Sequence, residues 1–145
     1  MNILFLDIDG VLNNVMSIKP GKAWSHESWD PKCVALVKKM CKEHDLEIVV
    51  SSSWRCSWIR CIWFMGAAGL PCPIDRTPSL HGKSRGDEIT AWLKENSQVK
   101  SYVILDDEND FTDLQKEHHI QTSFNTGLIE AQTKIVGAII TKGMG

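Results

Sequence analysis

The sequence lacks the features that mark membrane proteins, secreted proteins and basic nucleic-acid-coating proteins. No stretch of its 145 residues approaches the roughly 18 consecutive apolar residues of a membrane span. The apolar run over residues 3–6 is far shorter than the hydrophobic segment of a secretory signal, so we expect a cytoplasmic protein with no membrane partner. The formal net charge of −2 provides no global basic field for non-specific nucleic-acid binding, so such binding would need a local basic patch.

The cysteines and histidines lack the spacing of disulfide frameworks and zinc sites. The five cysteines are odd in number, and no two of them form a Cys-x-x-Cys pair. Without an export signal, we expect them to be reduced thiols. His118 and His119 are adjacent and would point in different directions on a helix or strand, so a zinc site is poorly supported.

The pattern that is present is that of a single α/β domain over residues 1–145, a length that suits one buried core. Short apolar runs predict strands buried on both faces, and stretches with helical spacing lie between them. Strands are expected at 3–6, 47–50, near 72–75, 102–105 and 120–124; helices are expected from Pro31 onward and at 54–70, 87–96, 111–118 and 129–141. Alternating strands and helices predict parallel pairing, and therefore a three-layer, Rossmann-like α/β sheet.

Polar clusters follow three of the expected strands, at the sheet edge where such folds place their active sites. Four carboxylates meeting there would repel one another and raise their proton affinity. A hard divalent cation would remove this penalty, and oxygen ligands without histidine favour Mg²⁺ over zinc. The arrangement suits phosphoryl transfer. The clusters are Asp7 with Asp9, Ser51 to Ser53, and Asp106 with Asp107.

The two acidic residues of the first cluster are candidates for the central chemical roles. Asp7 lies nearest the end of its strand, so it is the better nucleophile, and its attack on phosphorus would form an aspartyl-phosphate. Asp9 can protonate the leaving oxygen and then deprotonate the water that hydrolyses the intermediate.

Serine and basic side chains supply candidate phosphate ligands. One of Ser51, Ser52 and Ser53 can bind the phosphate, and we favour Ser52. A cation ahead of the helix at 87–96 would offset charge on the phosphorus, and the sequence leaves Lys83 and Arg85 open for this role.

Together these segments resemble the four motifs of the haloacid-dehalogenase-like (HAD) superfamily, over residues 3 to about 107. The motifs are Asp7-Ile8-Asp9-Gly10-Val11, a strand followed by Ser52, a Lys or Arg before a helix, and a strand followed by Asp106-Asp107. Three segments further resemble the 3′-phosphatase domain of polynucleotide kinase-phosphatases and the small HAD domains of RNA-repair fusion proteins. These are Ser52-Ser53-Trp54-Arg55, Gly86-Asp87-Glu88-Ile89 with Trp92, and Ile104-Leu105-Asp106-Asp107.

The resemblance implies a catalytic mechanism and a metal site. Asp7 would be the nucleophile and Asp9 the acid and base. Mg²⁺ would be bound by Asp7, the main-chain carbonyl of Asp9 and Asp107, with Asp106 in support. Asp110 would be either an outer ligand or the N-cap of the next helix.

The segment over residues 13–30 is too short for a separate cap domain, so the site should be open to large substrates. Trp24 or Trp29 in this segment would either stack on a substrate base or pack within the flap. Ser53 and Arg55 are further candidates for substrate binding, although Arg55 is equally interpretable as a structural cation. The spacing of Trp54, Trp58 and Trp63 is typical of a helix face packed into the core.

The resulting prediction is a Mg²⁺-dependent phosphomonoester hydrolase that acts on a nucleic-acid end or a nucleotide. One alternative is a phosphatase for small metabolites, and another is a catalytically idle HAD fold that serves as a binding module. The retention of Asp7, Asp9 and Asp107 argues against the idle module. The sequence does not determine the substrate, the pathway or the oligomeric state.

Overall fold

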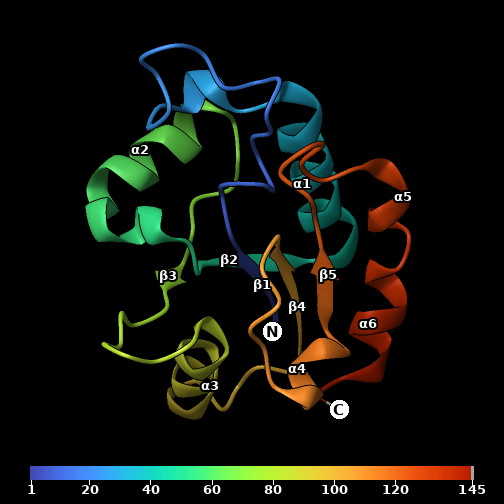
Figure 1. Ribbon diagram of the computed structural model, residues 1–145. Helices are drawn as coiled ribbons and strands as arrows, with labels where there is room; N and C mark the ends of the chain where they lie inside the picture. Colours follow the sequence, from blue (N-terminus) through green and yellow to red (C-terminus); the bar gives the residue numbers. More distant parts are fainter. Residues whose placement is uncertain (145) are drawn as a thin grey trace.

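The computed structural model describes residues 1–144, and its centre is a five-stranded parallel sheet in the order β3-β2-β1-β4-β5 (Figure 1). The strands are β1 (Asn2–Leu6), β2 (Leu46–Val50), β3 (Asp75–Arg76), β4 (Ser101–Asp106) and β5 (His119–Gln121). Helices cover both faces of the sheet, so the predicted three-layer, Rossmann-like α/β fold is confirmed. The assignment of residues 1–145 to one domain stays a prediction.

The central strand β1 shows why its sequence is a continuous apolar run. Successive side chains of a strand point to opposite faces. Leu4 and Leu6 pack in the core on one face of the sheet, whereas Ile3 and Phe5 pack in the core on the other. The neighbouring strand β4 divides its buried side chains between the same two faces in the same way. Both strands are therefore apolar at almost every position until their carboxyl ends.

The helices are shared unequally between the two faces. Side chains of α1, α2 and α6 join the core that contains Leu4 and Leu6, and α3 packs on the face of Ile3 and Phe5 (Figure 1). The α-helices are α1 (Pro31–His44), α2 (Trp58–Ala67), α3 (Arg85–Glu95), α4 (Asp113–Lys116), α5 (Glu130–Thr133) and α6 (Val136–Lys142), and the 3₁₀ helices are η1 (His26–Ser28) and η2 (Ser53–Ser57). None of the helices found in residues 1–144 is long and apolar enough to cross a membrane.

Local capping determines where two of these helices begin. The side chain of Asp30 accepts a hydrogen bond from the main-chain N–H two residues later, and Pro31 occupies the first position of α1. Ser84 and Asp87 form a reciprocal capping box at the start of α3. This helix therefore begins at Arg85, two residues before the predicted start, and the earlier start brings Arg85 into the first turn.

Two predicted helices are wrong in extent. The helix predicted over 54–70 begins as the separate 3₁₀ helix η2, because Ser52 caps that short segment through its side chain. The helix predicted over 129–141 is divided into α5 and α6. The Thr133 hydroxyl donates to the carbonyl of Glu130 at 2.7 Å, a local bond that competes with continuation of the helix.

The prediction that Trp54, Trp58 and Trp63 form one helix face packed into the core is also wrong. Trp54 lies in η2 and is buried, Trp58 is half-buried, and Trp63 in α2 is 63% exposed. The residues that α2 buries are Cys61 and Met65, four positions apart, which is the spacing of one helix face.

All five cysteines are free, in agreement with the expected reduced thiols. Cys33, Cys41 and Cys61 are buried, and Cys56 and Cys72 are exposed. Burial raises the pKa of the Cys41 thiol to about 12 and that of Cys61 to about 11, so both are inert as nucleophiles at neutral pH.

Candidate active site

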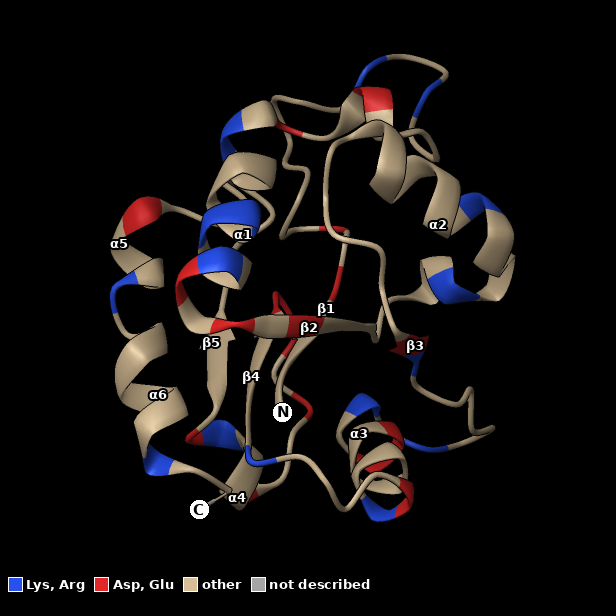
Figure 2. Cartoon of the chain, turned by 180° about the vertical axis from the view of Figure 1, so that it is seen from behind, with Lys and Arg blue, Asp and Glu red and all other residues tan. Residues whose placement is uncertain are grey.

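Three acidic side chains meet beyond the carboxyl ends of β1 and β4. The strands pair in register up to Leu6 and Leu105, and the N–H of Asp7 continues the pairing with a 3.0 Å hydrogen bond to the carbonyl of Leu105. Asp7 thus leaves β1 beside Asp106 and Asp107, and one carboxylate oxygen from each of the three lies within 4.8 Å of the others. Figure 2 shows acidic segments in red at this edge of the central strands.

Burial and mutual repulsion raise the proton affinity of these carboxylates. Asp7 is 4% exposed and Asp106 is fully buried. Burial and then the charge of Asp106 raise the pKa of Asp7 well above its ordinary value, although Arg85 opposes them. Burial is also the main cause that raises the pKa of Asp107. A fold that holds these acids together without a further cation keeps them in an electrostatically unfavourable state.

Arg85, at the first position of α3, is the cation that the structure brings to this cluster. One of its terminal nitrogens lies 3.1 Å from Asp7 Oδ1 and 2.8 Å from Asp106 Oδ2. Burial lowers the pKa of Arg85, but the carboxylates of Asp7 and Asp106 raise it by more, so the guanidinium stays charged. Lys83, the other candidate, is exposed and belongs to none of the ion pairs found in residues 1–144.

Asp110 supports the start of α3 and does not cap the next helix. Its carboxylate accepts a hydrogen bond from the Arg85 N–H at 3.3 Å, and its carbonyl accepts one from the Gly86 N–H. The N-cap of α4 is Thr112, whose hydroxyl accepts from the N–H of Gln115, so the N-cap alternative for Asp110 is wrong.

Asp9 stands apart from this cluster and has partners of its own. The indole N–H of Trp54 donates to Asp9 Oδ2 at 3.1 Å, and the side-chain amide of Asn13 donates to Asp9 Oδ1 at 2.9 Å. The same Asn13 amide accepts from the N–H of Gly10. Each carboxylate oxygen of Asp9 is therefore held by one neutral donor.

Sequence reasoning did not identify Asn13 and Trp54 as site residues. The chain makes a helical turn after β1, because the N–H groups of Val11 and Leu12 both donate to the carbonyl of Ile8. A residue four positions after Asp9 then faces it, which is a weak signal for Asn13. For Trp54 the sequence holds no comparable signal, since its contact with Asp9 spans 45 residues.

Gly10 makes room for Asp107. Its φ is +80°, a conformation that favours glycine, and an added Cβ would lie 2.5 Å from Asp107 Oδ2 and 2.9 Å from Asp107 Cβ. The Gly10 carbonyl in turn accepts a hydrogen bond from the Thr122 hydroxyl after β5. The glycine of the first motif is therefore needed both for its turn and for the close approach of the second acidic motif.

The three serines after β2 have different surroundings. Ser51 and Ser52 are fully buried, and Ser53 is exposed. Ser52 is the N-cap of η2 and accepts from the Trp54 N–H at 3.2 Å, which leaves its hydroxyl proton for another acceptor. The Ser51 hydroxyl has no hydrogen-bond partner among the residues described. Which serine binds phosphate stays a prediction.

Arg55 has protein partners for both terminal nitrogens of its guanidinium. It is 6% exposed, forms an ion pair with Glu88 of α3 at 2.8 Å, and donates to the carbonyls of Ser51 and Ser52 at 2.9 Å each. Glu88 also accepts from the Leu80 N–H. The geometry favours the interpretation of Arg55 as a structural cation that ties the serine turn to α3.

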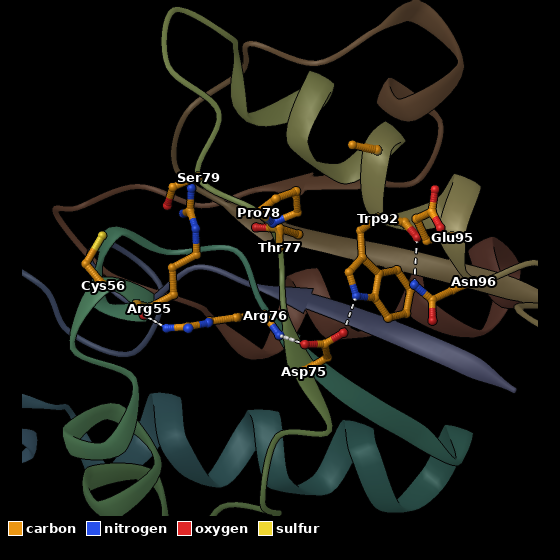
Figure 3. A pocket seen from close by; sticks show the side chains of 11 residues that line it. Arg55, Cys56, Asp75, Arg76, Thr77, Pro78, Ser79, Trp92, Glu95 and Asn96 are labelled. Atoms are coloured by element: carbon orange, nitrogen blue, oxygen red, sulfur yellow. Dashed lines mark hydrogen bonds between the residues drawn. The ribbon is translucent and has the colours of Figure 1, made fainter.

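A cavity of about 600 Å³ lies on the β3 side of the site, between η2, the segment after β3 and the end of α3 (Figure 3). Arg55, Thr77 and Trp92 contribute to its wall, and the Trp92 indole donates to Asp75 at 2.7 Å. The acidic residues after β1 and β4 do not line it. The cavity therefore does not contain the candidate catalytic groups.

Hydrogen bonds between residues of the same segment hold the flap over residues 13–30 in its conformation. The Ser28 hydroxyl donates to the Lys22 carbonyl and accepts from the Lys19 N–H, and the Ser17 hydroxyl donates to the Ser28 carbonyl. The only helix in this segment is the single turn η1. Trp29 is buried and packs in the core that contains Leu4 and Leu6, next to Trp54 of η2, whereas Trp24 is 63% exposed.

The parallel sheet, the Asp-x-Asp turn after β1 and the paired acids after β4 are the features of a HAD-like α/β domain. Residues 3–133 match the family described as "HAD domain in Swiss Army Knife RNA repair proteins", and the chain belongs to this family. No curated protein and no solved structure matches the chain. The predicted resemblance to HAD domains of RNA-repair proteins is confirmed, and membership supports a HAD-type phosphatase in general terms.

We predict that Gly10→Ala destabilises the protein more than Gly21→Ala. Both glycines have a positive φ, but an added Cβ at Gly21 meets nothing within 4 Å, whereas at Gly10 it collides with the Cβ of Asp107. The backbone strain is matched, so the difference should be the overpacking cost of roughly 1–3 kcal/mol in the free energy of unfolding. Urea denaturation of the two variants measures it, and equal losses would show that Gly10 is not needed for the approach of Asp107.

Proposed function

We propose that this chain is a Mg²⁺-dependent phosphomonoesterase that forms an aspartyl-phosphate at Asp7 and acts on the phosphorylated end of a nucleic acid. The observation that carries the proposal is the convergence of Asp7, Asp106 and Asp107, with oxygens within 4.8 Å of one another and a raised pKa at Asp7. Burial of several carboxylates in one place is unfavourable for folding, and it is typical of a site that holds a cation or a titrating group.

The donor set fits magnesium. All three clustered side chains offer carboxylate oxygens, and a divalent cation would remove the repulsion that raises the pKa of Asp7 and Asp107. Asp7, Asp107 and the main-chain carbonyl of Asp9 would hold the ion, with Asp106 in support through its bond to Arg85. When bound, Mg²⁺ supplies positive charge that offsets the negative charge of the substrate phosphate.

Asp7 is suited to nucleophilic attack. Its main chain is fixed by the bond to β4, and Arg85 contacts one of its oxygens. In the proposed first step an Asp7 oxygen forms a bond to phosphorus, the bond to the leaving oxygen breaks, and Asp9 donates a proton to that oxygen. In the second step Asp9 takes a proton from water, the water oxygen bonds to phosphorus, and Asp7 is released together with inorganic phosphate.

Asp9 is oriented for these proton transfers by its own neighbours. Trp54 and Asn13 each hold one of its oxygens, so the carboxyl group cannot rotate freely. A carboxyl group whose orientation is already fixed loses less conformational entropy on reaching the transition state than a mobile one. The separation of Asp9 from the acidic cluster gives the two aspartates of the first motif different roles.

The open site and the family support a macromolecular substrate. The flap over 13–30 is bonded within itself and contains a single-turn helix, so it supplies no separate cap domain that would enclose a small molecule. The family is that of HAD domains in RNA-repair proteins. For a phosphomonoesterase in such a protein, we propose a phosphorylated RNA end as the substrate. A small-metabolite phosphatase would need another means of closing the site.

Asp7→Asn should reduce the rate of phosphate release by at least about 10³-fold, because the amide cannot form the phosphoenzyme. The free energy of unfolding should be unchanged or increased, since the substitution is nearly isosteric and removes one of the repelling charges. Asp113→Asn, at a fully exposed aspartate of α4, is the matched control and should keep wild-type turnover. Substantial turnover by Asp7→Asn would rule out covalent catalysis at this residue.

Chelation should abolish turnover, and added Mg²⁺ should restore it. Mg²⁺ should also raise the melting temperature of the wild-type protein, because a ligand that binds only the folded state stabilises it. Asp107→Asn should lose most of this thermal shift, and Asp113→Asn should keep it. An equal shift in all three proteins would place the metal somewhere else.

The substrate class is tested by phosphate release from oligonucleotides with a 3′- or 5′-phosphate, free nucleotides, sugar phosphates and phosphopeptides. We expect the highest kcat/KM for a phosphorylated oligonucleotide end. A sugar phosphate as the best substrate would indicate a metabolite phosphatase. The absence of release from every compound would favour the idle binding module.

A further inference from the structure

An aromatic pocket next to Asp9 has no role in the phosphate chemistry described above. It is a cavity of about 250 Å³ between the flap and the start of α2. Trp24 comes from the flap, Trp54 from η2, and Arg60 and Phe64 from α2; Figure 1 shows the flap beside α2. The remaining wall is formed by Ser53, Cys56, Ser57 and Cys61.

The aromatic side chains of this pocket pack against one another, and Trp24 offers the exposed ring face because Trp54 beneath it is only 4% exposed. The ring centroids of Trp24 and Trp54 are 5.3 Å apart, and those of Trp54 and Phe64 are 5.9 Å apart. Trp24 is nevertheless 63% exposed, so the packing leaves much of its indole available. Exposed indole faces bind planar unsaturated rings, with about 1–3 kcal/mol per stacked nucleobase. The cavity is smaller than the roughly 300–1,000 Å³ of typical small-molecule sites, so it fits one ring system better than a whole nucleotide.

Trp54 connects the pocket to Asp9. It forms part of the pocket wall and also donates its indole N–H to Asp9 at 3.1 Å. Asp9 is the group proposed to protonate the leaving oxygen, so the leaving group must approach the Asp9 side of the phosphate. For a nucleic-acid end, the leaving group is the dephosphorylated strand, and the part of it nearest the phosphate is the terminal nucleoside, which carries a planar base.

Polar groups at the pocket are also suited to a nucleoside. Arg60 is exposed and takes part in no ion pair within residues 1–144, so its charge is available to an adjacent phosphodiester. Ser53 is exposed beside it and can donate or accept a hydrogen bond at a base edge.

We propose that the pocket formed by Trp24, Trp54, Arg60 and Phe64 is a base-binding subsite that holds the terminal nucleobase of the leaving group. This inference rests on the proposed function, since it assumes hydrolysis at a nucleic-acid end. Trp54 then serves two purposes: its ring supports the ring of Trp24, and its N–H orients Asp9. A base stacked on Trp24 is therefore one ring away from the side chain that positions the acid.

The test compares two oligonucleotides that carry the same terminal phosphate and differ only in whether the terminal nucleotide has a base or is abasic. Wild-type kcat/KM should be about 5- to 100-fold higher for the base-bearing end. In Trp24→Ala this ratio should fall close to one, and in Trp24→Phe, which keeps an aromatic face, most of it should remain. Trp63→Ala is the matched control, because Trp63 is also 63% exposed but does not line the pocket; it should keep the wild-type ratio.

An unchanged ratio in Trp24→Ala, with turnover retained, would overturn the base subsite while leaving the proposed function intact. An equal fall in Trp63→Ala would overturn it as well. If neither oligonucleotide is hydrolysed, the proposed function fails, and the pocket is tested by binding alone. Calorimetry should then show that the Asp7→Asn protein binds adenosine monophosphate more tightly than ribose 5-phosphate, and that adding Trp24→Ala removes the difference. Equal affinity for both compounds would reject the subsite.

Discussion

Electrostatic repulsion among Asp7, Asp106 and Asp107 is the constraint around which the site is arranged. The fold brings these acids together through the register of β1 and β4. Because Gly10 has no side chain, Asp107 approaches the first motif more closely than it could if another residue stood at position 10. One buried cation, Arg85, offsets part of the repulsion, yet the pKa of Asp7 stays raised. The remaining imbalance is the physical reason for which we propose a divalent ion at this edge of the sheet.

The supports of the site come from elements on both sides of the central strands. The capping box of α3 places Arg85 in its first turn, and Glu88 one turn later holds Arg55 against the serine turn after β2. Because α3 thus contacts two motifs at once, a shift of this helix would disturb both. Asp9 depends instead on the turn after β1 and on η2, so the proposed nucleophile Asp7 and the proposed acid Asp9 are positioned by largely separate contacts.

Part of this arrangement is predictable from the sequence. Apolar runs followed by acids, with the rule that parallel sheets place their sites beyond the strand ends, were sufficient for the fold and for the convergence of Asp7, Asp106 and Asp107. The choice of Arg85 over Lys83 depends on where α3 begins. The Arg55–Glu88 and Trp54–Asp9 contacts join residues far apart in sequence, where local patterns carry no information. The exposure of Trp63 was mispredicted because η2 interrupts the apparent helical spacing.

The chain is a HAD domain of the family found in RNA-repair proteins. Its acidic cluster lies beyond the ends of β1 and β4, and Trp54 connects Asp9 to the aromatic pocket. The central claim is that the crowded carboxylates share one metal ion. Anomalous diffraction from crystals soaked in Mn²⁺, a redox-stable stand-in for Mg²⁺, tests it most directly. We predict a strong peak in contact with both Asp7 and Asp107. A well-ordered structure in which the two carboxylates bind no common ion, or in which the peak lies elsewhere, would contradict the account.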